Sequence, residues 1–261
     1  MNGICRNCGK TRLLQHSHAI PNGFFRPIAR AGGGQFIEIN DGQSLARNSQ
    51  DSGCDFLLCS QCEALFGSVF DAPLIDEVRN IRKAFRSGVK ALASDPEKIK
   101  ASISSILWRA SVSQARLYRK FVVPSQIFYH LEREMWSIKG RNREFSYSVS
   151  PVYDKFPGNA LGFSEEMLSN FILTPKPWNI AHGFAGRVRN GWGAIFLVGG
   201  AAIAVVQPRL SPYKERQNLF LNSDGAESHV RPIDMWSVPY VREFLGNAVR
   251  KERRESPYPG R

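Results

Sequence analysis

The chain has 261 residues, of which 43% are hydrophobic, a proportion that is ordinary for a soluble globular protein. The longest apolar run, residues 193–206, is interrupted by Gly199-Gly200 and is too short to span a bilayer, which excludes a membrane-spanning chain. Thirty-five Lys and Arg against 23 Asp and Glu give a formal net charge of +12, which favours a polyanionic partner such as nucleic acid.

Two cysteine pairs mark the first predicted module, residues 1–72. Cys5 and Cys8 are separated by two residues and are followed by a glycine, as in a zinc knuckle. Cys59 and Cys62 open a predicted helix. Four thiolates satisfy tetrahedral Zn²⁺, so we expect a structural zinc site. The 50 residues between the pairs include a stretch rich in turn formers, residues 31–53, for which we expect an irregular loop. Cys54 has no partner at ligand spacing.

No export signal precedes the first cysteine pair, and paired cysteines in such a chain are typical of metal ligands rather than disulfides. We therefore expect a cytoplasmic protein.

Helices are predicted for the second module, residues 73–143. Pro73 fits the first position of a helix whose apolar residues recur at steps of three and four as far as Leu92. Asp95-Pro96 starts a second helix that continues towards Phe121, and a third follows Pro124.

Strands are predicted for the third module, residues 144–261. Two apolar runs, 194–198 and 201–206, flank Gly199-Gly200 and indicate a hairpin. Residues 235–251 fit a closing helix before a charged tail. The expected fold class is α+β: a treble-clef zinc module, a helical middle segment and an antiparallel, β-rich C-terminal region.

Basic residues are concentrated in the middle segment, where residues 79–143 hold fifteen bases and four acids. Five of the bases step by three and four along one helix face, opposite the apolar one. We expect this basic stripe to bind phosphates. Its members are Arg79, Arg82, Lys83, Arg86 and Lys90. Arg109 stands alone in an apolar stretch, where it is either part of an ion pair at the core edge or a semi-buried functional group.

A histidine motif lies between the two cysteine pairs. His18 is followed by Ala19, Ile20 and Pro21, and the second pair is preceded by two leucines. This order of cysteine pair, His-x-x-Pro and Leu-Leu-Cys-x-x-Cys resembles the zinc-finger branch of the HNH, or ββα-metal, endonucleases, over about residues 4–72. The resemblance implies that His18 is the general base, that Mg²⁺ or Mn²⁺ is the catalytic cofactor, and that DNA rather than RNA is cleaved.

The chain departs from the usual family pattern at the metal ligands. Ser17 precedes His18 where an Asp or His is common, and Glu63 follows Cys62 where Asn is usual. The chain is similar in this respect to a branch that has Ser-His-x-x-Pro and Cys-x-x-Cys-Glu with a later acid, which implies Glu63 or Asp71 as ligand of the catalytic metal. The two lie eight residues apart and share a helix face if the helix is unbroken.

Structural roles are the alternative for each of these residues. His18 fits a buried histidine that orients the knuckle, and His16 fits either a neighbour of the zinc site or an exposed side chain. Asp71 fits a helix cap, and Glu63 fits a charge that complements a helix N-terminus.

The sequence therefore predicts a metal-dependent, DNA-cleaving HNH-like nuclease, and the resemblance implies a setting in bacterial antiviral defence or in a mobile element. The alternative is a zinc-stapled module that binds nucleic acid but has lost catalysis. A third option is a regulatory protein that binds a protein partner through residues 144–261.

Overall fold

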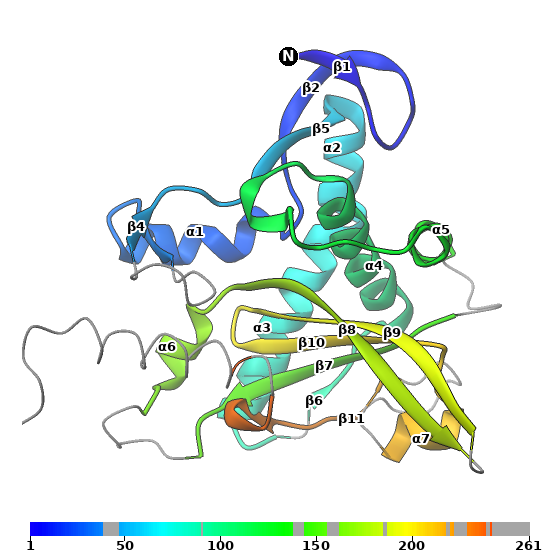
Figure 1. The fold of residues 1–261 in the computed structure, drawn as a ribbon. Helices are drawn as coiled ribbons and strands as arrows, with labels where there is room; N and C mark the ends of the chain where they lie inside the picture. The colour runs from blue at the N-terminus through cyan, green and yellow to red at the C-terminus, as the bar shows by residue number, and fades with distance from the viewer. Residues whose placement is uncertain are drawn as a thin grey trace, which may run out of the picture.

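The structure is a computed structural model that describes residues 1–38, 47–89, 91–137, 144–155, 162–184, 187–217, 220–221, 229–238 and 241. Helices and antiparallel sheets both contribute, and the four-cysteine cluster lies near the N-terminus, so the predicted α+β class is confirmed. A small sheet stands at the top of the molecule and a larger sheet lies below it, with helices between them (Figure 1).

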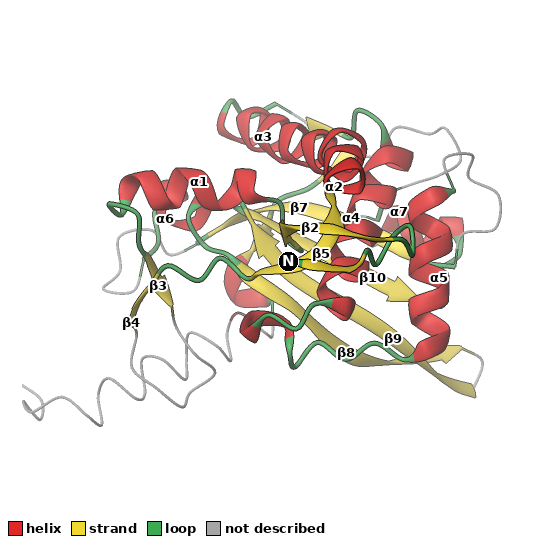
Figure 2. Cartoon of the chain, turned by 90° about the horizontal axis from the view of Figure 1, so that it is seen from above, coloured by secondary structure: helices red, strands yellow, loops and turns green. Residues whose placement is uncertain are grey.

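The small sheet belongs to the cysteine module and has the order β1-β2-β5. Its strands are β1 Asn2–Ile4, β2 Thr11–His18 and β5 Cys54–Cys59. Helix α2, Ser60–Phe66, follows β5 directly, as the second cysteine pair predicts. Helices α1, Asn22–Ala31, and α5, Ser125–Trp136, flank this sheet on opposite sides (Figure 2).

The connection between β2 and β5 is more ordered than its composition suggests. It contains helix α1, Asn22–Ala31, and a short hairpin of β3, Phe36–Glu38, with β4, Arg47–Ser49. The prediction of an irregular loop over residues 31–53 was therefore wrong for these strands, because turn formers flank the three-residue strands and hide their pattern. Residues 39–46 lie outside the described part.

One long helix crosses the predicted boundary at residue 72. Helix α2 continues through a widened π-turn, η1 Gly67–Asp71, into α3, Ala72–Arg86. The amide of Ala72 bonds the carbonyl of Gly67, five residues back, which defines the wide turn. Pro73 lacks an amide proton and disfavours a regular turn before it, so the π-turn lets the chain pass through Pro73 without ending the helix.

The other two predicted helices are α4, Pro96–Val112, and α5, Ser125–Trp136. Asp95 caps α4 by accepting a hydrogen bond from the amide of Lys98, as expected of an N-cap. Helix α4 ends at Val112 rather than near Phe121, because the hydroxyl of Ser113 and the amide of Gln114 turn to bond Asp55. A single 3-10 turn, η2 Arg116–Tyr118, follows.

The large sheet has the order β12-β7-β10-β9-β8 and is antiparallel except for the β12–β7 pair. Gly199 and Gly200 close the β9–β10 hairpin with φ of 56° and 77°, as in a type I′ turn, so this hairpin prediction is confirmed. The five strands are β7 Ser146–Tyr153, β8 Leu173–Phe184, β9 Arg187–Val198, β10 Ala201–Gln207 and β12 Ile233–Asp234.

Two apolar clusters cover the two faces of this sheet. The larger joins α1, α3, α4 and α5 to β7, β9 and β10. The smaller lies under α6, Glu165–Ser169, and the 3-10 turn η3, Met235–Ser237. The remaining short elements are β6 Ala91–Leu92, its partner β11 His229–Val230, and α7 Pro212–Gln217.

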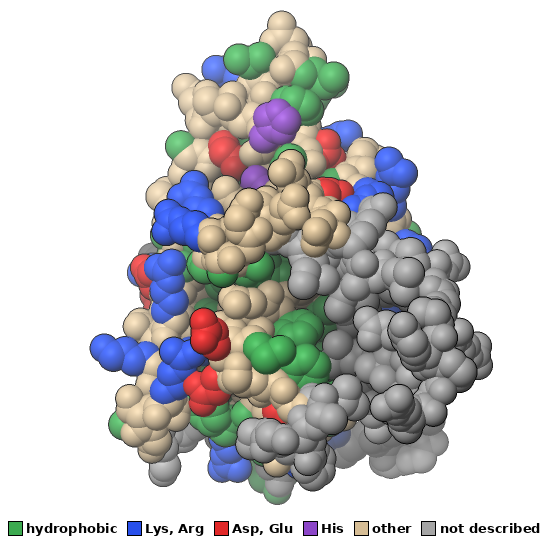
Figure 3. Space-filling model, turned by 90° about the vertical axis from the view of Figure 1, so that its left-hand side faces the viewer, with side chains coloured by type: hydrophobic (Ala, Val, Ile, Leu, Met, Phe, Trp, Pro, Cys, Tyr) green, Lys and Arg blue, Asp and Glu red, His purple; other side chains and the backbone are tan. Residues whose placement is uncertain are grey.

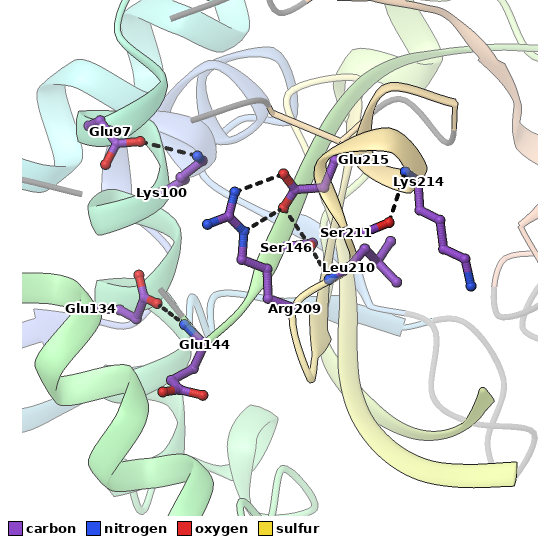
Figure 4. A network of polar contacts seen from close by, with 10 residues as sticks. All are labelled: Glu97, Lys100, Glu134, Glu144, Ser146, Arg209, Leu210, Ser211, Lys214 and Glu215. Atoms are coloured by element: carbon purple, nitrogen blue, oxygen red, sulfur yellow. Dashed lines mark hydrogen bonds and ion pairs between the residues drawn. The ribbon is translucent and has the colours of Figure 1, made fainter. Parts of the chain in front are cut away.

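Buried ionic groups lie between α7 and the sheet and within α4 (Figure 4). Glu215 is almost fully buried and accepts hydrogen bonds from Arg209 and from the hydroxyl of Ser146 on β7. Lys100 on α4 is buried and pairs with Glu97 at 3.1 Å. The partners of these charges are in place, which is the condition for burying them.

The closing helix predicted over residues 235–251 does not start at Met235: the 3-10 turn η3 ends at Ser237, and Val238 is extended with a ψ of 108°. Residues 239–240, 242–251 and the charged tail lie outside the described residues. None of the described helices combines the length and the apolar composition needed to cross a membrane.

Candidate functional site

The four predicted zinc ligands come together at the top of the small sheet. The Sγ atoms of Cys5, Cys8, Cys59 and Cys62 all lie within 4.8 Å of one another, and those of Cys8 and Cys59 are 4.0 Å apart. Tetrahedral zinc with Zn–S bonds of about 2.3 Å places its sulfur atoms about 3.8 Å apart. The cluster therefore fits a metal ion such as Zn²⁺.

Backbone turns and N–H···S contacts hold this cluster in shape. Gly9 adopts a φ of 68° and its amide bonds the carbonyl of Cys5, which closes the knuckle. The amide of Cys59 donates to the Sγ of Cys5, and the side chain of Asn7 donates to the Sγ of Cys62, both at 3.3 Å. Because thiolates accept hydrogen bonds well, these donors favour the form that binds metal.

The protein environment lowers the pKa of one of the four thiols and raises that of another. Burial tends to raise the pKa of Cys5, but backbone hydrogen bonds from Cys8, Cys59 and Asn7 outweigh it and lower the pKa to about 6. Burial raises the pKa of Cys62 to about 12.

The gap of 50 residues between the cysteine pairs is bridged by the sheet itself. The amide of Arg6 bonds the carbonyl of Leu57, so the knuckle is fixed directly to β5. Among the described residues, the four cysteines are the one group of three or more His, Cys, Asp or Glu side chains close enough to share a metal ion. The exposed Cys54 is not part of it.

His18 lies at the end of β2, opposite Cys54 in the register of β5. Its ring is half-buried beside Phe25, and its Nε2 is 2.9 Å from the hydroxyl of Ser52. His16 lies away from the zinc ligands: its ring contacts Phe56, with 4.2 Å between centroids. The interpretation of His16 as a neighbour of the zinc site was therefore wrong, because this exposed ring contacts Phe56 at an angle of 52° and lies outside the four-cysteine group.

Ser17 connects β2 to helix α2, which contains Cys62 and Glu63. Its side chain is fully buried and its hydroxyl donates to Glu63 Oε2 at 2.5 Å. Burial raises the pKa of Glu63, and the Ser17 hydrogen bond opposes this effect. Ser17 thus orients Glu63 in this structure.

The π-turn changes the angular relation between Glu63 and Asp71. On a regular α-helix, residues eight apart point about 80° away from each other, whereas residues seven apart differ by about 20°. A π-turn takes up one extra residue, so across η1 the pair behaves as if it were seven apart and lies near one helix face. The condition of an unbroken helix is met, and the widened turn improves the alignment.

Asp71 makes no capping bond with its side chain, so its interpretation as a helix cap was wrong. Its two carboxylate oxygens instead accept hydrogen bonds from the guanidinium of Arg109, at 2.5 and 3.2 Å. Of the two roles considered for Arg109, the ion pair is the one that the structure contains.

Burial and the charges of Arg109 and Asp71 act on the pKa of His18 and on the pKa of Glu63. Burial is the largest cause that lowers the pKa of His18, the charge of Arg109 lowers it further, and Asp71 acts in the opposite direction. The same two charges act with opposite signs on the pKa of Glu63. Two carboxylates and a neutral imidazole are donors that suit Mg²⁺ or Mn²⁺.

A titration of His18 by NMR is expected to give a pKa below the usual 6.5, because burial disfavours the imidazolium. As the pH falls below 6.5, the unfolded chain takes up this proton before the folded one, so the stability contributed by His18 is lost in acid. Asp71→Asn is expected to lower the His18 pKa further, because it removes the charge that raises it. A pKa above 6.5 in the wild-type protein would contradict this account.

Three of the five side chains in the predicted basic stripe have partners within the protein. Arg82 and Arg86 contact the first residue of α6: Arg82 donates to the carbonyl of Glu165, and Arg86 pairs with its carboxylate at 2.7 Å. Arg79 pairs with Asp76 at 3.5 Å, with both side chains largely exposed. Lys83 is exposed and makes no ion pair with a described residue, whereas Lys90 lies outside the described residues.

Ser52 was not found by sequence reasoning, because a serine in a polar loop carries no signal. Its loop is held by Asp51, which pairs with Arg116 at 2.9 Å, and by Gly53, whose φ is 71°. A Cβ at Gly53 would lie 2.8 Å from the ring of Tyr118, so only glycine fits there.

Histidine side chains reach the surface beside acidic ones in the upper part of the face shown in Figure 3.

In comparisons with known proteins, no family model, no curated protein and no solved structure matches the chain.

Proposed function

We propose that this protein is a metal-dependent endonuclease of the HNH type that hydrolyses phosphodiester bonds in DNA, and that it acts in the cytoplasm. The observation that carries the proposal is the Ser17–Glu63 hydrogen bond, which ties the strand that ends in His18 to the helix that bears Glu63 and Asp71. This is the combination of strand and helix that the resemblance requires.

The residues of the chain have distinct roles in this reaction. His18, kept neutral by burial, accepts a proton from the attacking water. Its ring is oriented by the Ser52 hydroxyl at Nε2, which leaves Nδ1 as the nitrogen that takes the proton. Glu63 and Asp71 would hold the divalent cation, which would supply a positive charge to stabilise the phosphate and the leaving oxygen.

A plasmid assay tests the proposal. Zinc-loaded protein at low salt is expected to relax or linearise supercoiled plasmid when Mg²⁺ or Mn²⁺ is added, and to leave it intact without them. Intact plasmid at every Mg²⁺ and Mn²⁺ concentration would contradict the proposal.

A second candidate is a zinc-stapled module that binds nucleic acid without cutting it. The observation that favours it is the bidentate Arg109–Asp71 pair, which occupies a proposed metal ligand. The described residues also contain no group of His18, Glu63 and Asp71 within metal-sharing distance. Binding of DNA with a full salt dependence but no cleavage would favour this candidate.

Both candidates predict a role for Lys83 in binding DNA. Because Lys83 is exposed and unpaired among the described residues, Lys83→Ala is expected to reduce the slope of log affinity against log salt by about one. Lys98 is the matched control, since it is exposed but pairs with Asp95 at 3.1 Å. Equal slopes for the wild type and for Lys83→Ala would remove Lys83 from the interface.

A further inference from the structure

The ion pair between Asp71 and Arg109 lies inside the candidate site but joins two separate elements. Asp71 ends the π-turn η1, whereas Arg109 comes from α4, outside the cysteine module. Both Nη atoms of Arg109 donate to the Asp71 carboxylate, one to each oxygen. The pair is therefore bidentate, the geometry in which a guanidinium binds a carboxylate most firmly.

The surroundings of Arg109 give its guanidinium no other acidic partner among the described residues. The side chain is 1% exposed, its Nε is 3.4 Å from the carbonyl of Ser105, and its guanidinium lies over the ring of Phe66 at 5.5 Å. A buried guanidinium without a carboxylate is strongly unfavourable, so Arg109 depends on Asp71.

Arg109 also acts on the other groups of the site. Burial is the main influence on the pKa of Glu63 and of His18, and the charge of Arg109 lowers both. Glu63 and Asp71 together carry two negative charges when ionised, and Arg109 balances one of them. A divalent cation at the same carboxylates would be repelled by the guanidinium for as long as it stays there.

We propose that Arg109 is the resident counter-ion of Asp71 in the metal-free protein, and that a divalent cation binds Asp71 only when the guanidinium leaves it. This inference rests on the proposed function for the nature of the ligand. The ion pair is then a lock that keeps the site inactive until the cation concentration is high enough to displace the guanidinium.

Cation affinity measured on zinc-loaded protein tests the lock. Arg109→Met removes the charge while keeping an apolar stem beside Phe66, and it is expected to raise the Mn²⁺ affinity roughly tenfold or more. Arg109→Lys keeps the charge and is expected to stay close to the wild type. Asp71→Asn in the Arg109→Met background is expected to abolish the gain. An unchanged or lower affinity in a folded Arg109→Met protein overturns the inference.

The wild-type protein provides a test that needs no variant. While the bidentate pair holds, ¹⁵N NMR of the Nη atoms is expected to show slow rotation of the Arg109 guanidinium. This rotation is expected to become fast when Mg²⁺ is added. Nη signals that do not change at saturating Mg²⁺ overturn the inference, whether the pair persists or no cation binds.

The two experiments separate this inference from the proposed function. Plasmid cleavage with an unmoved Arg109 overturns the lock alone. Release of Arg109 without cleavage supports the lock and overturns the nuclease.

Discussion

His18→Ala is expected to lower the rate of plasmid cleavage by about 10²–10⁴-fold, the range that general-base catalysis contributes. Burial of the His18 ring lowers its pKa, so the imidazole is available as a proton acceptor at neutral pH. Alanine removes the proton acceptor but leaves the zinc ligands and the Ser17–Glu63 hydrogen bond in place. Zinc content and DNA affinity are therefore expected to stay near wild type.

His16→Ala is the matched control for this experiment. His16 lies on the same strand, two residues away, but it is exposed and its ring is tilted against Phe56. Its loss is expected to change the cleavage rate by less than about threefold, as for a surface substitution. A His18→Ala protein that cuts as fast as its parent would remove His18 as the base and favour the binding module.

The fold was predictable where local pattern and packing agree. The Gly199-Gly200 hairpin follows from two apolar runs around a turn that requires positive φ at both positions. The cap at Asp95 and the helix after Pro124 follow from the same local rules.

The fold was not predictable where tertiary contacts decide. The helix through Pro73 depends on the π-turn η1, and no residue pattern marks it. The end of α4 at Val112 depends on Asp55, which lies 58 residues from Ser113 in the chain and reaches it only in the folded protein.

The candidate site was predictable where its residues lie at short intervals in the chain, and not where their partners are distant in sequence. The cysteine spacing indicated the metal cluster because a chelate needs its ligands at short intervals, whereas the partners of His18 and Asp71 are long-range. Arg109 is a single charge in an apolar stretch of the sequence. This pattern favours a buried ion pair but does not identify the partner residue.

Loss of one zinc ligand is expected to have the largest effect on stability. Cys62→Ser leaves three thiolates, and structural zinc contributes roughly 10–16 kcal/mol in small zinc-finger peptides, so loss of the ion is expected to unfold residues 1–66. Cys5, Cys59 and Cys62 also pack in one apolar cluster with Phe66 and Trp108, so the damage is expected to reach α4. The core on one face of the large sheet includes Ala19, Ile20, Phe24 and Phe25 and is expected to be weakened. The cluster on the other face contains no residue from 1–66 and is expected to persist.

Zinc content by mass spectrometry and limited proteolysis measure this loss together. The wild type is expected to carry one zinc per chain, and Cys62→Ser is expected to carry none and to be cut within residues 1–66. Cys54→Ser is the control, because Cys54 is exposed and outside the cluster, and it is expected to keep its zinc. A wild-type protein without zinc, or a Cys62→Ser protein that keeps a full equivalent, would show that the four thiols do not form a metal site. The position of His18 depends on the metal site, because the four cysteines fix the sheet that contains its strand.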